Sequence, residues 1–421
     1  MPGGLGQAGP IWLDVTRLVS RAGRGVQTGI DRVEAAYLDH LLEQGGPAAR
    51  FLLRSTRGYL LLGPEGGALL ARLVRGEAGL PPRGDLLSQA YGKGSDPRHR
   101  VERALRGVAR DRCLRGGLAR MIRRHGGGGF LYLNTGHANL SEATLAPLAT
   151  AAGVRVAVLV HDLIPLTHPE LVEHGMPARF AGRIARIARH ADLVICNSAA
   201  TEAELAAHWH DRQARPPCVV ALLGLEPDPA PRPDVVRRDD RFVMLGTIEP
   251  RKNHAMMLEV WERLAERLPP ERMPDLHIIG PVGWRVEGLM ARLRSHPLLG
   301  RSIHLHGPLP EAELRRHLAE ARALVFPSLA EGYGYPPLEA LRAGALPICS
   351  ELPVFRETLG NSAVYLDVAD PYCWVTTIEQ HISGKVALPL PSRPTLPDWS
   401  GHFETVGAAL GQVRVVRVDG L

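Results

Sequence analysis

The feature that most constrains the fold is an alternation of short apolar runs with helical periods in the second half of the chain. Apolar runs of strand length lie at residues 241–246, 275–280, 302–307, 323–328, 345–350 and 363–368. Segments between them, such as 255–268 and 311–321, carry apolar residues at helical spacing. This alternation predicts a parallel, doubly wound sheet, whose ligands bind beyond the carboxyl ends of the strands.

The first half repeats the alternation less regularly, and 421 residues suffice for two domains. We predict an α/β fold with an N-terminal domain at 1–232, a C-terminal domain at 233–395, and a helix in 396–421 that crosses back to the first domain. A proline-rich linker at 225–234 separates the domains. The Gly- and Arg-rich residues 60–128 are hard to assign, and we interpret them as a basic insertion in the N-terminal domain.

The segment GTIEPRKN (246–253) indicates an anion site. It follows an apolar run and precedes a helical period, so Arg251 and Lys252 fall at a strand-to-helix turn. Such a turn offers backbone N–H groups and the positive end of a helix dipole to an anion. Lys252 is one of three lysines among the 50 basic residues, beside Lys93 and Lys385. A lysine that is so rare in this chain favours a role in phosphate binding over a passive surface charge.

The segment EGYGYPPLEA (331–340) holds two carboxylates eight positions apart, Glu331 and Glu339. Glycines and prolines between them exclude one continuous helix. We therefore expect a Gly-rich turn that carries Glu331, followed by a helix with Glu339 in its first turn. Because carboxylates suit polyol hydroxyls and a cationic turn suits a pyrophosphate, the two segments together predict a nucleotide-sugar site.

These two segments resemble the donor half of retaining glycosyltransferases of the GT-B fold, the large family 4. The E-x7-E spacing of Glu331 and Glu339 is that family's signature, and HIIG, LHGPLP and VFPSL lie in order between the two segments. The resemblance covers residues 240–375 closely and the first half loosely. It implies two Rossmann-like, doubly wound parallel-sheet domains that face each other across a cleft, and a reaction that needs no bound metal.

The resemblance also implies roles in the second half. Arg251 and Lys252 would stabilise the leaving diphosphate, Glu331 would contact hydroxyls of the transferred sugar, and Glu339 would bind the ribose. Leu309 would present its backbone to the base edge, and Tyr333 would pack over the sugar or simply fill the loop. The further donor contacts that we expect are Gly246, Thr247, Gly332 and Gly334.

In the first half, the stretch HDLIP (161–165) follows a fully apolar run. The resemblance implies that His161 points at the donor sugar and phosphate, where it would stabilise charge. Asp162 and Ser198 each have two interpretations, a site residue or a helix cap. Gly29 in TGIDRVE would lie near the pyrophosphate, in a loop that relatives usually make richer in glycine.

Charge and composition limit the partners. Residues 51–124 hold sixteen basic and six acidic side chains, and the whole chain carries a net charge of +6. The densest part, 98–124, is interpreted either as a cationic amphipathic helix on an anionic membrane or as a solvated helix. Aromatic residues do not interleave with these arginines, so we do not expect a nucleic-acid partner.

The sequence shows no apolar stretch of membrane-spanning length, no signal-peptide pattern, and no metal spacing among its five cysteines. We therefore predict a cytoplasmic protein with reduced thiols, with peripheral contact at the inner face of the plasma membrane. We expect neither a metal nor a cofactor.

The HDLIP and GTIEPRKN segments are similar to those of bacterial mannosyltransferases of exopolysaccharide and O-antigen assembly. We predict retaining transfer of a hexose, with GDP-mannose as the favoured donor, to a glycan or lipid-diphosphate-linked acceptor. Two alternatives stay open. One is another GT-B reaction, such as phosphorolysis or epimerisation, and the other is a non-catalytic relative that binds a nucleotide sugar as a scaffold subunit.

Overall fold

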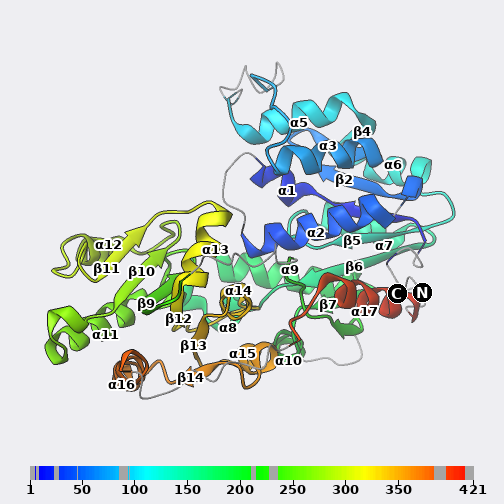
Figure 1. Cartoon of the computed structure of the whole chain (residues 1–421). Helices are drawn as coiled ribbons and strands as arrows, with labels where there is room; N and C mark the ends of the chain where they lie inside the picture. Colours follow the sequence, from blue (N-terminus) through cyan, green and yellow to red (C-terminus); the bar gives the residue numbers. More distant parts are fainter. Residues whose placement is uncertain are drawn as a thin grey trace.

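Two twisted sheets form the framework of the computed structural model, which describes residues 5, 9–22, 28–44, 46–84, 93, 95–209, 215–226, 236–383 and 395–412 (Figure 1). The predicted domain boundary at 232/233 and most of the predicted linker lie outside these residues. The first sheet has the order β4-β3-β2-β1-β5-β6-β7-β8 and the second the order β11-β10-β9-β12-β13-β14.

The strands form at every apolar run that the sequence analysis named. In the first sheet they are β1 (Ile11–Asp14), β2 (Arg50–Arg54), β3 (Gly58–Leu62), β4 (Ala109–Leu114), β5 (Phe130–Asn134), β6 (Val154–Val160), β7 (Leu193–Cys196) and β8 (Cys218–Val220). In the second they are β9 (Arg238–Leu245), β10 (Asp275–Ile279), β11 (Ile303–His306), β12 (Ala321–Phe326), β13 (Leu346–Ser350) and β14 (Val364–Leu366). All pairings in the second sheet are parallel.

Helices cover both faces of both sheets. The first half carries α1 (Thr16–Arg21), α2 (Gly29–Gln44), α3 (Pro64–Val74), α5 (Pro97–Gly107), α6 (Leu118–His125), α7 (Glu142–Thr150), α8 (Ile164–Thr167), α9 (Met176–His190) and α10 (Ala199–His208). The second carries α11 (His254–Arg267), α12 (Glu287–Arg294), α13 (Glu311–Glu320), α14 (Tyr335–Ala343), α15 (Pro353–Leu359) and α16 (Pro371–Ile382), and α17 (Trp399–Gln412) follows. Short 3-10 turns are η2 (Gly46–Ala48), η3 (Arg115–Gly117), η4 (Pro169–Leu171), η5 (Pro250–Lys252) and η6 (Pro270–Arg272).

Residues 98–124 do not form a single helix, so both interpretations of that stretch as a helix are wrong. The chain folds there as α5, the edge strand β4, η3 and the short α6. In β4, half-buried residues alternate with exposed ones such as Arg110 and Arg112, which is the period of a strand rather than of a helix. β4 pairs antiparallel with β3, and β3 pairs antiparallel with β2, so β3 and β4 extend the edge of the first sheet.

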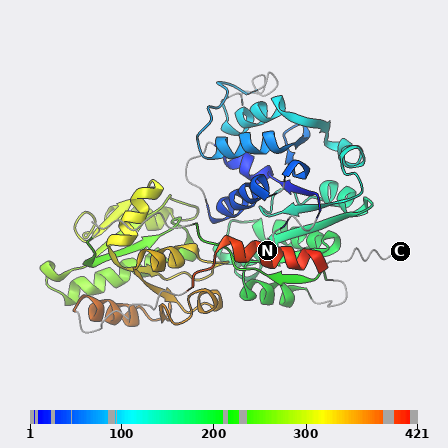
Figure 2. The same cartoon turned by 45° about the vertical axis from the view of Figure 1, so that its right-hand side comes forward.

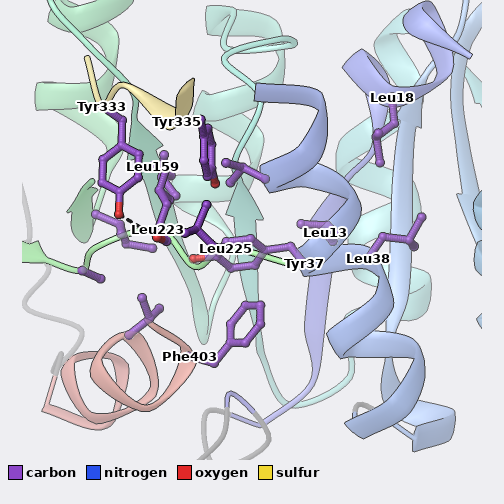
Figure 3. Close-up of a cluster of buried hydrophobic side chains, with 14 of the residues drawn as sticks. Leu13, Leu18, Tyr37, Leu38, Leu159, Leu223, Leu225, Tyr333, Tyr335 and Phe403 are labelled. Carbon is purple, nitrogen blue, oxygen red and sulfur yellow. Dashed lines mark hydrogen bonds between the residues drawn. The ribbon is translucent and has the colours of Figure 1, made fainter. Parts of the chain in front are cut away.

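One hydrophobic core runs from the first half into the second. It joins side chains of α2 and β1 to side chains of the Glu331 segment and of α17, as Figure 3 shows for Tyr37, Tyr333, Tyr335 and Phe403. The rings of Tyr37 and Phe403 pack edge to face with centroids 5.0 Å apart. The final helix α17 therefore lies against the first half although it follows the second in sequence (Figures 1 and 2).

The two halves each have a further core on the opposite face of their sheet. Within the described residues, no helix combines the length and apolar character that crossing a membrane requires. The architecture is thus α/β, with two largely parallel sheets, each enclosed by helices.

Candidate functional site

The turn between β9 and α11 carries the two predicted cations. Gly246 ends the strand with φ +136°, and a Cβ built on it would lie 3.3 Å from Cε of Lys252. Gly280 approaches the same point so closely that a Cβ there would lie 2.0 Å from the Gly246 carbonyl oxygen. These glycines leave room for the Lys252 side chain to fold back beside the carboxyl end of β9.

Lys252 is buried, with 5% of its surface exposed, so it is not a passive surface charge. Its ammonium forms an ion pair with Glu331 and lies 4.1 Å from the centroid of the Phe326 ring. Arg251 pairs with the other Glu331 oxygen at 2.7 Å and with Glu249. The predicted phosphate turn and the predicted sugar carboxylate therefore meet in one buried network of alternating charges.

The charges in this network shift one another's pKa. Burial by itself raises the pKa of Glu331, but the charges of Arg251 and Lys252 outweigh burial and lower it to about 2. Burial lowers the pKa of Lys252 to about 8, although the Glu331 carboxylate opposes that shift. At neutral pH Glu331 is ionised and Lys252 is largely protonated, and the ammonium is close to its titration range.

The Glu331 segment rests on the first half of the chain. A Cβ on Gly332 would lie 2.3 Å from the carbonyl oxygen of His161, so only glycine fits between Glu331 and the end of β6. The hydroxyl of Thr201 in α10 donates to the Gly332 carbonyl at 3.4 Å. Asp162 lies close enough for its charge to act on Arg251. The structure thus brings the HDLIP segment and the Glu331 segment together, as a shared site requires.

His161 follows β6 as expected, but its ring is buried. Its Nε2–H donates to the carbonyl oxygen of Thr135 at 2.6 Å. Burial lowers the pKa of His161 to about 4, so the imidazole is neutral at pH 7. A neutral ring carries no formal charge to offer a phosphate, and the tautomer with Nε2–H leaves Nδ1 as a hydrogen-bond acceptor.

The two ambiguous polar residues of the first half both make local backbone contacts. Ser198 is the N-cap of α10 and accepts a hydrogen bond from the Thr201 N–H at 3.0 Å. Asp162 accepts from the Ile164 N–H at 3.2 Å, at the start of α8. A cap thus accounts for Ser198, whereas Asp162 combines a turn contact with its position beside Arg251.

The second predicted carboxylate, Glu339, lies in the second turn of α14 rather than the first. Its carboxylate forms an ion pair with Arg32 of α2, which joins the two halves of the chain. The Arg32 guanidinium also lies over the Tyr335 ring, 5.3 Å from its centroid. Gly29, one turn earlier in α2, would place a Cβ 3.3 Å from the same ring, so the TGIDRVE segment packs directly on the Glu331–Glu339 segment.

The remaining predicted contacts lie in the Glu331 segment and in nearby loops. The Tyr333 hydroxyl donates to the Leu223 carbonyl at 2.6 Å, and its ring belongs to the core shared by the two halves, which corresponds to the packing interpretation (Figure 3). Gly334 starts α14 with φ +84° against the ring of Phe355. Leu309 is half-buried in the loop before α13, and Thr247 lies against Gly283.

Sequence reasoning missed three charged residues of this region, namely Arg32, Glu249 and Glu357. The Glu357 carboxylate of α15 accepts from the Ala199 and Ala200 N–H groups at 2.7 and 3.2 Å, so it caps α10 from the other half of the chain. Arg32 lies inside the motif TGIDRVE, and Glu249 lies inside the motif GTIEPRKN. No local signal identifies the partner of Arg32, because Arg32 and Glu339 are 307 positions apart, whereas Glu249 pairs with Arg251 in the same motif.

Comparison with known proteins finds a family model that matches the second half of the chain. Residues 239–383 match the family model described as "Glycosyl transferases group 1". The serotype-specific mannosyltransferase WbdA of Escherichia coli is 30% identical over 251 residues, which cover 55% of this chain and 30% of WbdA. The O-antigen chain mannosyltransferase B of Escherichia coli is 33% identical over 138 residues, or 33% of this chain and 34% of that protein. The chain thus spans only about a third of the length of these curated relatives.

Solved structures extend the likeness to the whole fold. Anabaena Alr3699/HepE in complex with UDP-glucose aligns with a TM-score of 0.56 at 11% identity, covering 96% of this chain and 95% of that one. The apo form of the lipopolysaccharide outer core galactosyltransferase WaaB aligns with a TM-score of 0.53 at 14% identity, covering 95% and 98%. At these identities the likeness shows the fold alone, and that fold is GT-B.

Proposed function

We propose that the protein transfers mannose from GDP-mannose to a growing cell-surface glycan, with retention of the anomeric configuration. The proposal starts from the GT-B fold and from the match of residues 239–383 to the "Glycosyl transferases group 1" model. The observation that carries the proposal is the buried pairing of Lys252 and Arg251 with Glu331 at the carboxyl ends of the strands. The mannosyltransferase relatives support the choice of sugar.

The chemical problem in such a transfer is the departure of a diphosphate from an oxocarbenium-like centre. Fixed positive charge close to the leaving oxygen lowers that barrier, and it acts most strongly where water is excluded. Lys252 and Arg251 supply two charges on a short turn at the N-terminal side of α11. We propose that the bound diphosphate shares these cations with Glu331, which in turn orients a hydroxyl of the mannose.

Both carboxylates of the E-x7-E pair already have partners, Glu331 with two cations and Glu339 with Arg32. Both carboxylates therefore serve to position other groups. We propose that the leaving phosphate oxygen accepts the proton of the acceptor hydroxyl on the same face of the sugar. His161 would accept a hydrogen bond from the sugar through Nδ1. This assignment needs neither a carboxylate nucleophile nor a metal.

A donor panel tests the proposal. Release of nucleoside diphosphate from GDP-mannose, UDP-glucose, UDP-galactose and UDP-N-acetylglucosamine would be measured with and without a lipid-linked glycan acceptor. We expect nucleoside diphosphate to be released from GDP-mannose alone, with strong stimulation by the acceptor, and no UDP from the three UDP-sugars. If GDP-mannose binds in calorimetry but no donor turns over with any acceptor, the non-catalytic alternative is correct.

The Arg32–Glu339 pair leads to a prediction about nucleotide affinity. If Glu339 binds the ribose, the nucleotide has to displace Arg32 from the same carboxylate. We expect Arg32→Ala to tighten binding of free GDP by roughly three- to tenfold, on the scale of a partly buried charge pair, as measured by isothermal titration calorimetry.

Arg285→Ala is the matched control, because Arg285 bridges the halves through the Glu170 and Val172 carbonyls without touching Glu339. It should leave GDP affinity unchanged. A GDP affinity that falls in Arg32→Ala would show that Arg32 assists the nucleotide instead of competing with it.

The exposed basic surface of β4, η3 and α6 supports a further part of the proposal, peripheral contact with an anionic membrane at the inner face of the plasma membrane. Leu114 at the end of β4 is 75% exposed, and the arginines around it point to solvent. These exposed arginines are Arg110, Arg112, Arg115, Arg120, Arg123 and Arg124. Cations beside an exposed leucine suit the interface of a membrane with anionic headgroups, where a lipid-diphosphate-linked acceptor would reside.

We predict that the protein binds vesicles containing anionic lipid and leaves them as salt is raised, because surface charges are screened. Reversing Arg120, Arg123 and Arg124 to glutamate should abolish sedimentation with these vesicles and preserve turnover with a soluble acceptor. Reversal of Arg263, Arg292 and Arg315 changes the net charge equally on exposed helices of the second half and should preserve binding. Equal sedimentation with neutral and anionic vesicles would contradict the electrostatic account.

A further inference from the structure

A group of histidines lies on the face of the second sheet that α13 covers, apart from the Lys252–Glu331 network. His277 comes from β10, His306 from the edge strand β11, and His317 from α13. Leu276, Ile278 and Ile303, which alternate with these positions along the strands, point into the core on the opposite face. The three imidazole rings have mutual centroid distances of 5.0 to 5.3 Å.

The nitrogen atoms of this group are poorly satisfied by the protein itself. His277 and His317 are 7% and 8% exposed. Nδ1 of His277 lies 2.9 Å from Nε2 of His306, and the two share one hydrogen bond. Nε2 of His277 and Nδ1 of His317 are buried and have no hydrogen-bond partner among the described residues. Burying such nitrogen atoms without partners is costly, so a native protein usually provides a ligand for them.

One ligand nitrogen from each of His277, His306 and His317 lies within 4.8 Å of the others. Zinc bound by imidazole has Zn–N distances of about 2.0–2.1 Å in a tetrahedral arrangement, which small side-chain rotations would reach from here. Imidazole coordinates a metal in its neutral form, and the burial of His277 and His317 favours that form. The half-buried His306 leaves a route from solvent.

The charges around the three rings also affect cation binding. Arg241 of β9 lies near all three rings and opposes a cation, but its guanidinium pairs with Glu320 at the end of α13. Glu320 also lies 3.8 Å from Arg316. His304 lies outside the group and pairs instead with Asp275 at 3.3 Å. Among the described residues of this region, His277, His306 and His317 thus offer the most ring nitrogen atoms without a hydrogen-bond partner.

We propose that His277, His306 and His317 form a Zn²⁺ site that ties α13 to the edge of the second sheet, with the fourth position open to water. On binding, each neutral ring gives the lone pair of one nitrogen to the metal and keeps its single proton on the other nitrogen. The site is structural, because it lies in the sheet–helix layer and not in the Lys252–Glu331 network. It also holds the loop 307–310 from both sides, since His306 precedes that loop and His317 follows it.

The test uses the full chain without a histidine tag, dialysed against a chelator. Zn²⁺ would be titrated in competition with a chromophoric chelator, metal content measured by mass spectrometry, and the melting temperature recorded with and without Zn²⁺. We expect one equivalent of tightly held Zn²⁺, a higher melting temperature on binding, and no response to Mg²⁺. Co²⁺ in its place should give the intense visible absorption of a tetrahedral site.

His306→Gln and His317→Gln should each lower Zn²⁺ affinity at least about tenfold, since loss of even an outer-shell partner costs 10–100-fold. His304→Gln is the matched control and should leave affinity unchanged. A wild-type chain that keeps no Zn²⁺ in the competition overturns the proposal, whatever the stability of the variants. A loss of affinity in His304→Gln with none in His306→Gln and His317→Gln overturns the ligand set and places the metal at Asp275, His277 and His304.

Discussion

Lys252→Met is expected to lower kcat/KM for the nucleotide-sugar donor by at least about 10²-fold, which corresponds to about 2.7 kcal/mol of lost transition-state stabilisation. Methionine keeps most of the apolar length beside the Phe326 ring and removes the ammonium that pairs with Glu331. The diphosphate would then leave against one fixed cation, Arg251, instead of two. Initial rates of GDP release across a range of GDP-mannose concentrations measure the effect.

The burial of Lys252 means that the same substitution also affects stability, so both quantities have to be measured. Removing one partner of a buried pair costs about 3–5 kcal/mol when the other charge is left alone. Here Glu331 keeps Arg251 at 2.7 Å, and we expect a smaller loss. Arg263→Met on α11 is the control, because that arginine is 48% exposed and pairs with Glu259 on the surface. Turnover within about threefold of wild type in Lys252→Met would show that the phosphate site lies elsewhere.

Glu331→Gln and Glu339→Gln are expected to change different kinetic constants, because the native carboxylates of Glu331 and Glu339 would contact different parts of the donor. Glu331 would contact the sugar, whose charge changes as the glycosidic bond stretches, so its loss should lower kcat by at least about 10²-fold. Glu339 would contact the ribose, which does not react. Its loss should mainly raise the donor KM and weaken binding of free GDP.

The ion pairs of Glu331 with Arg251 and Lys252 make the prediction for GDP binding more specific. In Glu331→Gln the two cations lose their carboxylate partner, so free GDP should bind at least as tightly as it binds to the wild type. Calorimetric titration with GDP separates the two variants without turnover. If Glu331→Gln weakens GDP binding as much as Glu339→Gln does, the two carboxylate roles are exchanged or wrong.

The strands could be predicted from the sequence because each apolar run is a local signal. Stretches such as 242–245 and 323–326 carry apolar side chains on both faces, as strands buried between two layers of helices must. The carboxyl ends of those runs also located Gly246, Lys252 and Glu331 on one edge of the second sheet. The interpretation of residues 98–124 as a helix was wrong for the opposite reason. Exposed arginines on one face of the edge strand β4 give this stretch a charge density like that of a cationic helix.

The partners of the charged groups could not be predicted in the same way. Lys252 and Glu331 are 79 positions apart, and nothing in either segment shows that one neutralises the other or that both are buried. The candidate zinc site could not be predicted from the sequence either, because His277 and His306 are 29 positions apart. A metal motif on one short segment would have been visible, whereas ligands from two strands and a helix are not.

By itself, the sequence determined the alternating α/β architecture, the carboxyl-edge location of the cationic turn and the Gly-rich carboxylate loop, because periodicity, glycine and proline act over a few residues. The tertiary structure alone decided that Lys252 is buried, that His161 is neutral, and that Arg32 holds Glu339 across the two halves. Each of these depends on desolvation and on charges brought together by packing, and neither quantity is defined until the chain has folded.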